Sequence, residues 1–171
     1  MRNRNRSCRF GIVISGIITF GQVAIAGPYE DANDAFYKGD YKTYLKILEP
    51  LAIQGSPKAQ TWVGDVYVFG RGVPQDFRQA YKWYRLAATQ GNSDAQTYLG
   101  GIYRDGAGVA PDPVKAHMWY NVAASTATTD SRRSHLADLR DTVSKQMAPD
   151  QITQAQEMAT KCFASKFKDC D

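Results

Sequence analysis

The sequence has little of what catalytic and metal-binding sites are usually built from. Its 171 residues include three cysteines and two histidines, and no histidine lies near the cysteines of the C-terminal tail. A metal site is therefore not expected, and no cofactor is indicated. His117 and His135 stand alone, and neighbours on one helix do not give the convergent geometry of a catalytic triad. The two Gly-x-Gly segments lack the Gly-Lys-Ser/Thr of a phosphate-binding loop.

An excess of charge of one sign is also missing once the N-terminus is set aside. Residues 1–26 contain four of the 21 basic residues and none of the 17 acids, so the remaining chain has 17 of each. The formal charge of +4 belongs to that first segment. We therefore expect no basic surface for nucleic acid and no polybasic membrane patch. Nothing in the composition favours an enzyme.

The first 26 residues have the pattern of a Sec-type signal peptide. Four arginines precede the apolar stretch Phe10–Phe20, and Ala24-Ile25-Ala26 is a cleavage motif before Gly27. We expect cleavage after Ala26 and a mature chain that is exported, either periplasmic or secreted. The alternative is an uncleaved anchor, because Phe10–Ala26 reaches the short limit for a membrane span.

Cysteine usage agrees with export. Cys8 leaves with the leader, so the mature chain keeps an even pair, Cys162 and Cys170. In an oxidising compartment these two are expected to form a disulfide that folds the tail back on the last helix. Two free thiols in a frayed tail are the alternative.

What the sequence does contain is an internal repeat. Residues 55–90 and 91–126 align at an offset of 36 without a gap and are identical at 15 of the 36 positions. The shared residues are mainly alanine, glycine and aromatic, as in the pairs Ala59/Ala95, Gly64/Gly100 and Trp83/Trp119. Self-similarity at a fixed period predicts a stacked-repeat fold. Recurrence of the tryptophans indicates core packing.

Each copy is predicted to be an antiparallel helical hairpin. Ser56, followed by proline, starts a first helix that runs to about Phe69. The segment Gly70-Arg71-Gly72 indicates a loop with positive φ, and Asp76 starts the second helix. Gly64 costs roughly 1 kcal/mol inside a helix relative to alanine, which indicates a neighbour packed too close for a side chain. One hairpin cannot bury both faces, so others must stack on it.

The flanking segments are predicted to close the array. Residues 27–54 form a degenerate first hairpin without the Gly-x-Gly loop, with Asp40 capping its second helix. Residues 127–171 contain a helix from about Asp130, a second from Pro149, and a tail. We interpret them as C-terminal capping helices, because a stacked array needs atypical end units.

The string Ala-x4-Gly-x2-Tyr-x2-Gly-x-Gly-Val-x2-Asp-x3-Ala-x2-Trp-Tyr-x2-Ala-Ala occurs twice and resembles the Sel1-like repeat, a relative of the tetratricopeptide repeat with a longer loop. The resemblance covers residues 55–126, and residues 27–54 are similar to a tetratricopeptide unit. It implies an all-α fold, a right-handed α-solenoid of antiparallel helical hairpins. It also implies a role in binding other proteins, without chemistry of its own.

In tetratricopeptide-like stacks the first helix of each unit lines the concave side, so the resemblance implies a groove. The predicted contacts are the positions of the two first helices that do not pack inward: Lys58, Thr61, Asp65, Val68, Phe69, Asp94, Thr97, Arg104 and Asp105. Phe69 is the best single anchor, because an exposed aromatic in a groove is a typical hot spot. The mixture of apolar and charged residues suggests a mixed peptide epitope.

Three functions stay open. The first is an exported, non-enzymatic interaction module that holds a protein or peptide as an adaptor or regulator of an envelope system. The second is a β-lactam-binding or β-lactam-hydrolysing enzyme, as reported for cysteine-rich secreted Sel1-like proteins. Those have a cysteine pair in each unit, and only the Cys-x7-Cys tail of this chain is similar to them. The third is a passive structural spacer whose first helices are merely solvated.

Overall fold

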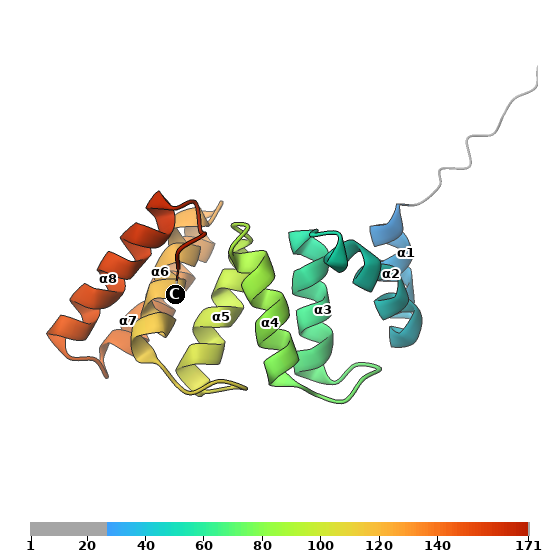
Figure 1. Ribbon diagram of the computed structural model, residues 1–171, viewed down its shortest axis with the longest axis horizontal. Helices are drawn as coiled ribbons and strands as arrows, with labels where there is room; N and C mark the ends of the chain where they lie inside the picture. The colour runs from blue at the N-terminus through green and yellow to red at the C-terminus, as the bar shows by residue number, and fades with distance from the viewer. Residues whose placement is uncertain (1–26, 171) are drawn as a thin grey trace, which may run out of the picture.

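The computed structural model describes residues 27–170, which form eight α-helices and no strand (Figure 1). The helices are α1 (Pro28–Tyr37), α2 (Tyr41–Ile53), α3 (Pro57–Phe69), α4 (Phe77–Ala88), α5 (Ser93–Asp105), α6 (Pro113–Thr126), α7 (Asp130–Ser144) and α8 (Pro149–Ala164). Up to α7, each helix packs against the next one along the chain. This is the all-α solenoid of helical hairpins that the repeat predicts. The expected leader lies outside the described residues.

The two repeats begin and end their first helices in the same way. Ser56 and Asn92 each accept a hydrogen bond from the backbone N–H three residues on. The helices then end on Gly70 at φ 62° and Gly106 at φ 70°, a left-handed conformation that costs other residues free energy. The Gly-x-Gly segments are therefore helix ends followed by a loop, as the sequence predicts.

The glycines inside α3 and α5 mark the closest approach within each hairpin. A β-carbon at Gly64 would lie 2.5 Å from the ring of Tyr84, and one at Gly100 would lie 2.6 Å from the ring of Tyr120. Real β-carbons do not come this close to other atoms. Each glycine therefore makes room for the tyrosine of the following helix, which confirms the prediction of a neighbour packed too close for a side chain.

A buried glutamine fixes each repeat to the unit before it. Gln60 of α3 donates to the carbonyl of Ala52 in α2 at 3.0 Å, and Gln96 of α5 donates to the carbonyl of Ala88 in α4 at 3.2 Å. Both glutamines are at most 3% exposed. A buried polar group that is satisfied in this way sets the spacing of adjacent hairpins.

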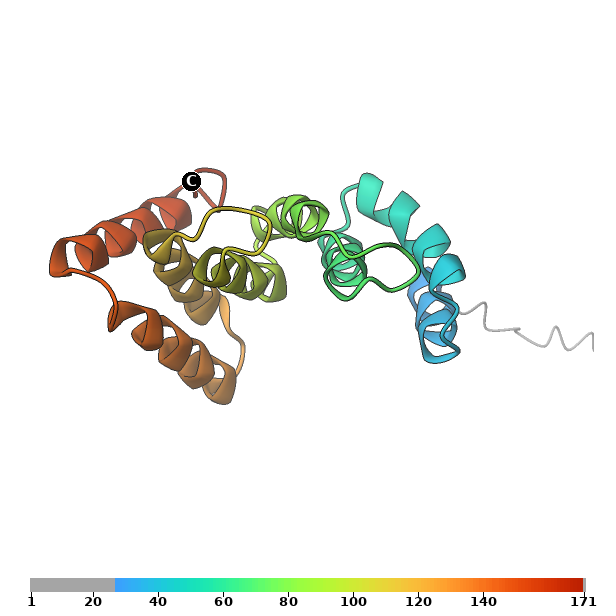
Figure 2. The ribbon, with the colours of Figure 1, turned by 90° about the horizontal axis from the view of Figure 1, so that it is seen from below.

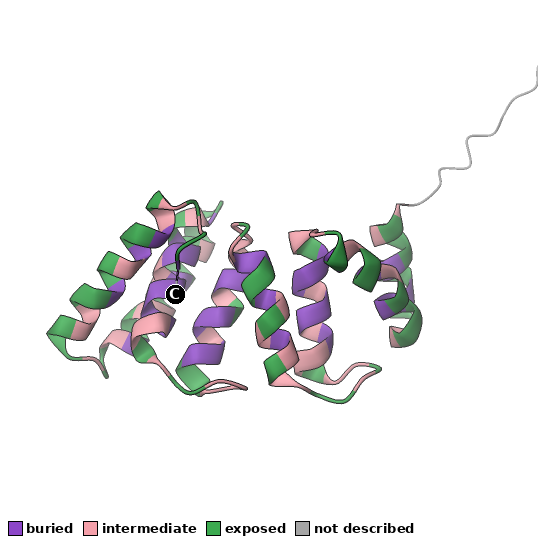
Figure 3. Cartoon of the chain, in the orientation of Figure 1, coloured by how far each residue is buried: buried purple, intermediate pink, exposed green. Residues whose placement is uncertain are grey.

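The tryptophans are not equally buried, which corrects the expectation that both lie in the core. Trp119 is 1% exposed, whereas Trp83 packs against the smaller N-terminal cluster and stays half-buried. The difference follows from the packing around their helices, because α6 is contacted by α5, α7 and α8, and α4 is contacted by α3 and α5. Figure 3 shows the buried residues gathered where helices face each other.

The C-terminal cap is more open than a closed hairpin. Both α7 and α8 pack on α6, and they diverge from each other (Figure 2). Ala148 at the N-cap of α8 offers no side-chain cap, and its N–H donates instead to Gln151 Oε1 at 2.9 Å. A disulfide joins Cys162 of α8 to Cys170 of the tail. None of the helices in residues 27–170 has the length and apolar character needed to cross a membrane.

Candidate partner-binding groove

The first helices of the hairpins form one concave side of the solenoid. Figure 2 shows α1, α3, α5 and α7 along the same side, with α1 and α7 projecting beyond α3 and α5 at the two ends. None of these four helices packs closely on another of them. Three hollows lie between these helices, and second helices contribute to their lining, as with Tyr44 of α2 and Tyr84 of α4.

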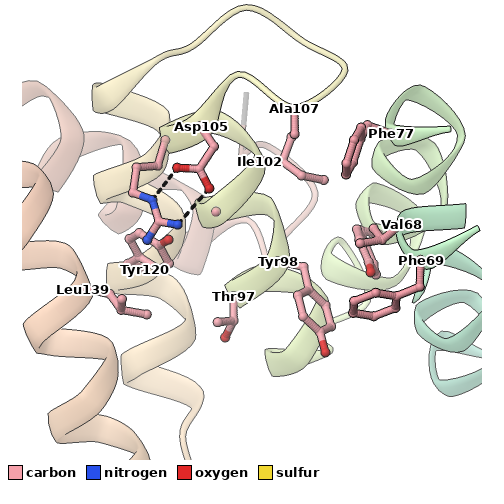
Figure 4. A pocket seen from close by; sticks show the side chains of 13 residues that line it. Val68, Phe69, Phe77, Thr97, Tyr98, Ile102, Asp105, Ala107, Tyr120 and Leu139 are labelled. Carbon is pink, nitrogen blue, oxygen red and sulfur yellow. Dashed lines mark hydrogen bonds and ion pairs between the residues drawn. The ribbon is translucent and has the colours of Figure 1, made fainter. Parts of the chain in front are cut away.

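The largest hollow on this side, about 320 Å³, lies between α3 and α5 and reaches α7 (Figure 4). It is lined by Val68, Phe69, Phe77, Tyr84, Thr97, Tyr98, Gly101, Ile102, Arg104, Asp105, Ala107, Tyr120 and Leu139. Most of this wall is apolar. Tyr98 stacks on Tyr84 with ring centroids 4.7 Å apart, so the middle of the hollow is an aromatic surface.

A smaller hollow flanks it on each side. One, of about 180 Å³, lies between α1 and α3 and includes Tyr37, Trp62 and Asp65. The other, of about 220 Å³, lies between α5 and α7 and includes Asp94 and His135. The three hollows follow one another along the first helices, and we call this row the groove.

Exposed aromatic side chains recur along the groove. Tyr37 is 84% exposed, Phe69 is 59% exposed and Tyr98 is 41% exposed. Tyr37 lines the hollow next to α1, and Phe69 and Tyr98 line the central one. Large rings exposed at a concave surface are typical of sites that bind another protein.

The structure brings most of the predicted contact residues to the groove. Five line the central hollow, namely Val68, Phe69, Thr97, Arg104 and Asp105. Asp65 lines the hollow next to α1, and Asp94 lines the hollow next to α7.

Two predicted contact residues do not line any of the three hollows. Thr61 is 4% exposed and its hydroxyl donates to the carbonyl of Pro57 at 2.8 Å, so its prediction as a contact residue is wrong. The α-helical projection placed Thr61 outward, but the folded protein buries it. Lys58 is exposed, and its Nζ lies over the rings of Tyr29 and Trp62, at 4.5 and 4.7 Å.

Several charges of the groove are already paired within the chain. Arg104 Nε lies 2.7 Å from Asp105 Oδ1, and Arg104 Nη2 lies 2.8 Å from Asp105 Oδ2 (Figure 4). This pairing holds the pKa of Asp105 below its ordinary value. Asp94 forms an ion pair with Arg132 of α7. Because both pairs are largely exposed, each is worth only a small free energy and can open to a partner.

Asp65 is in a different situation. Its carboxylate accepts a hydrogen bond from the Tyr84 hydroxyl at 2.6 Å, and no ion pair in residues 27–170 involves it. Burial raises the pKa of Asp65 to about 6, against the opposing effect of the Tyr84 hydrogen bond. The groove therefore contains a half-buried acid whose charge its neighbours poorly stabilise.

Sequence reasoning missed many of the residues that line the groove, among them Tyr98, Tyr37 and Arg71. Tyr98 occupies the repeat position of Trp62, so an aromatic at that position in both copies was an available signal. Tyr37 lies at the end of α1, where no repeat pattern points to it. Arg71 stands in the α3–α4 loop with its guanidinium over the rings of Phe36 and Phe69, 4.8 and 4.7 Å from their centroids.

The two histidines lie on different helices, His117 on α6 and His135 on α7. His117 is 2% exposed and packs beneath α7, and burial lowers its pKa. His135 is exposed at the edge of the hollow between α5 and α7. Within residues 27–170, no group of three or more His, Cys, Asp or Glu side chains is placed to hold a metal ion.

An array of stacked helical hairpins, with the first helices along a concave side, defines a tetratricopeptide-like α-solenoid. The Sel1 repeat model matches residues 57–92 and 93–125 of this chain. The chain therefore contains two Sel1 repeats. The matched copies begin two residues after the 36-residue units defined by the internal alignment. Proteins of this kind generally mediate protein–protein interaction, and their fold is typically a scaffold without catalysis.

Two solved structures share this architecture. A protective antigen of uropathogenic Escherichia coli strains that displays an SLR fold is 27% identical, with a TM-score of 0.73 over 85% of this chain and 32% of its own. A Sel1 repeat protein from Oxalobacter formigenes is 33% identical, with a TM-score of 0.51 over 55% of this chain and 38% of its own. This chain thus spans about a third of the length of these relatives. No curated protein matches it.

Proposed function

We propose that this protein is an exported interaction module that holds a segment of a protein partner in its groove, as an adaptor or regulator of an envelope system. The row of exposed aromatic side chains Tyr37, Phe69 and Tyr98 is the observation that favours this function. Exposing such rings to water is unfavourable unless a partner covers them. Export rests on the basic and apolar pattern of residues 1–26 and on the paired cysteines of the tail.

The shape of the groove favours an extended segment over a compact ligand. Three hollows follow one another between α1 and α7, and each is small, at about 180 to 320 Å³. A peptide lying across α3 and α5 can place one side chain in each. Phe69 and Tyr98 would then be the central anchors, surrounded by charged pairs that can open at the rim.

A matched pair of variants tests the proposal. Phe69→Ala combined with Tyr98→Ala removes the two central rings, and Leu86→Ala removes a 49%-exposed apolar side chain from α4, a second helix. Each tagged variant is expressed in the host, cross-linked and purified, and the recovered proteins are quantified. The groove variant should lose its partner by at least tenfold, and Leu86→Ala should not. Equal recovery with all three proteins would instead favour the passive spacer.

The β-lactam alternative is tested separately with nitrocefin. The disulfide in residues 27–170 joins α8 to the tail, and no cysteine lies within either repeat. Neither repeat therefore has the cysteine pair of the relatives for which that activity is reported. We expect no hydrolysis above the buffer rate by the purified protein. A turnover that depends on protein concentration would contradict a non-enzymatic role.

A further inference from the structure

The chain beyond residue 26 has balanced charge, but the acidic and basic residues are divided unequally between the first and the second helices of the hairpins. The first helices α1, α3, α5 and α7 contain nine acidic and five basic residues. The second helices α2, α4, α6 and α8 contain three acidic and seven basic residues, so the two sets have net charges of −4 and +4. Most of the acidic excess comes from Glu30, Asp31 and Asp34 of α1, which line none of the three hollows, so a preference for positive partner segments has to come from the acids of the groove itself.

Asp65 is the acid of the groove that a positively charged ligand would stabilise most. Asp94 and Asp105 already have arginine partners. Asp65, in the hollow between α1 and α3, has the neutral hydroxyl of Tyr84 as its hydrogen-bond donor and no ion pair within residues 27–170. A half-buried carboxylate in this state gains more from an incoming cation than an exposed one does.

The walls of the same hollow are suited to a cationic side chain. Four aromatic residues line it, namely Phe36, Tyr37, Tyr44 and Trp62. Aromatic faces attract ammonium and guanidinium groups, and the alkyl stem of lysine or arginine packs on apolar rings. A hollow of about 180 Å³ has room for one such side chain, not for a helix.

The protein's own cations already use this mode of contact next to the hollow. Lys58 Nζ lies 4.5 Å from the ring centroid of Tyr29 and 4.7 Å from that of Trp62. The guanidinium of Arg71 stands over Phe36 and Phe69 at the rim. Arg71 also lines this hollow and its charge lowers the pKa of Asp65, but no ion pair in residues 27–170 joins the two side chains, so the carboxylate can still pair with a ligand.

We infer that the segment held in the groove is basic, and that one of its lysine or arginine side chains enters the hollow between α1 and α3 to pair with Asp65. This inference rests on the proposed function and specifies the chemistry of the partner. The cation would lie against Trp62 and Tyr37, which line the hollow together with Asp65. The aromatic anchors of the central hollow would hold the next part of the same segment.

Synthetic peptides of opposite charge test the inference. One fluorescein-labelled peptide alternates alanine with lysine, a second alternates alanine with glutamate, and binding to the purified protein is followed by fluorescence anisotropy. The lysine peptide should bind at least about tenfold more tightly. Asp65→Asn should weaken the lysine peptide about tenfold, because the amide still accepts the Tyr84 hydroxyl but has no charge. Tyr37→Ala, at an 84%-exposed position, should weaken it several-fold without affecting folding.

Glu49→Gln is the matched control, because it removes one exposed negative charge from α2 on the other set of helices. Its affinity for the lysine peptide should stay within about twofold of wild type. The inference is overturned if Asp65→Asn and Glu49→Gln have equal effects, or if the glutamate peptide binds as well. If the peptide results overturn the inference while the Phe69 and Tyr98 double variant still loses the host partner, the partner binds in the groove but its bound segment is not basic. If the double variant keeps the partner, the proposed function of binding a partner in the groove is wrong.

Discussion

Repeat 1 (residues 55–90) and repeat 2 (residues 91–126) are the same unit placed in different surroundings. Of the 15 positions at which they are identical, only the one at Gly72 is exposed in either copy. Most first-helix positions that line the groove differ between the copies, as in the pairs Asp65/Gly101, Val68/Arg104 and Phe69/Asp105, with Thr61/Thr97 as an exception. What the repeats share is therefore packing, and what distinguishes them is the surface offered to a partner.

The surroundings differ as much as the surfaces. In repeat 2, α6 is enclosed by α5, α7 and α8, and the tail places Phe167 against Gly91 at the repeat boundary. In repeat 1, α4 is contacted by α3 and α5. The same tryptophan position is consequently sealed in one copy and half-buried in the other. This predicts that a substitution in repeat 2 lowers the free energy of unfolding more than the equivalent substitution in repeat 1.

Replacing the tryptophans tests this comparison with the largest expected effect. Trp119→Ala should lower the free energy of unfolding by about 3 to 5 kcal/mol, because it leaves a large cavity under α7 and α8. Trp83→Ala should cost about 2 kcal/mol, since solvent and neighbours fill part of the space. Urea unfolding followed by circular dichroism measures both. Equal costs would show that the C-terminal helices do not enclose repeat 2 as described.

The glycines of α5 give a sharper test within a single turn. Gly100→Ala should destabilise the protein by about 1 to 3 kcal/mol, because its β-carbon would meet the Tyr120 ring at 2.6 Å. The adjacent Gly101→Ala should be neutral or stabilise by up to about 1 kcal/mol, because the nearest atom is the Tyr120 hydroxyl at 3.7 Å. Thermal unfolding of the two variants should show shifts of opposite sign. Similar gains in stability in both variants would show the effect of helix propensity alone and would contradict the predicted clash at Gly100.

Much of the fold follows from the sequence because repetition doubles each local signal. The cap at Ser56 and the left-handed glycine at Gly70 are backbone requirements that only a few residue types meet, so their recurrence is informative. The divergence of α7 from α8 was not predictable, because it depends on both packing on α6. In the groove, Phe69 was found from helical projection. Thr61 was misplaced because a projection of one helix does not show which of its side chains the surrounding structure buries.

The disulfide-bonded tail packs against repeat 2, and repeat 1 has no equivalent of it. Removing the disulfide should therefore cause a moderate loss of stability. Replacing Cys162 and Cys170 with serine should lower the free energy of unfolding by about 2 kcal/mol, as expected for a cross-link that closes a short loop. Wild type in dithiothreitol should behave like the variant, and the variant should not respond to the reductant. No change on reduction would show that the tail contributes nothing to the packing at Gly91.

Asp65 has no acidic counterpart in repeat 2. Its effect on the free energy of unfolding should be the smallest of the four stability effects predicted for the tryptophans, the glycines, the disulfide and this acid. Its pKa near 6 in the folded state lies above the ordinary value of 3.8, so the folded state binds the proton more tightly. The resulting stabilisation is fully present below pH 4 and is lost as the pH rises through 6. Wild type should lose about 1 kcal/mol over this range on account of Asp65, after allowance for solvent screening. Asp65→Asn should remove that part of the pH dependence, which parallel urea titrations would detect.

The most direct test of the central claim is site-specific photocrosslinking in the native host. A benzoyl-phenylalanine is introduced at Phe69 in the groove or, in a second strain, at Leu86 on α4, which are comparably exposed at 59% and 49%. Binding in the groove predicts that one partner protein is cross-linked from position 69 and not from position 86, with its contact peptide rich in lysine or arginine. Cross-linking of the same partner from position 86 alone, or equally from both, would contradict it.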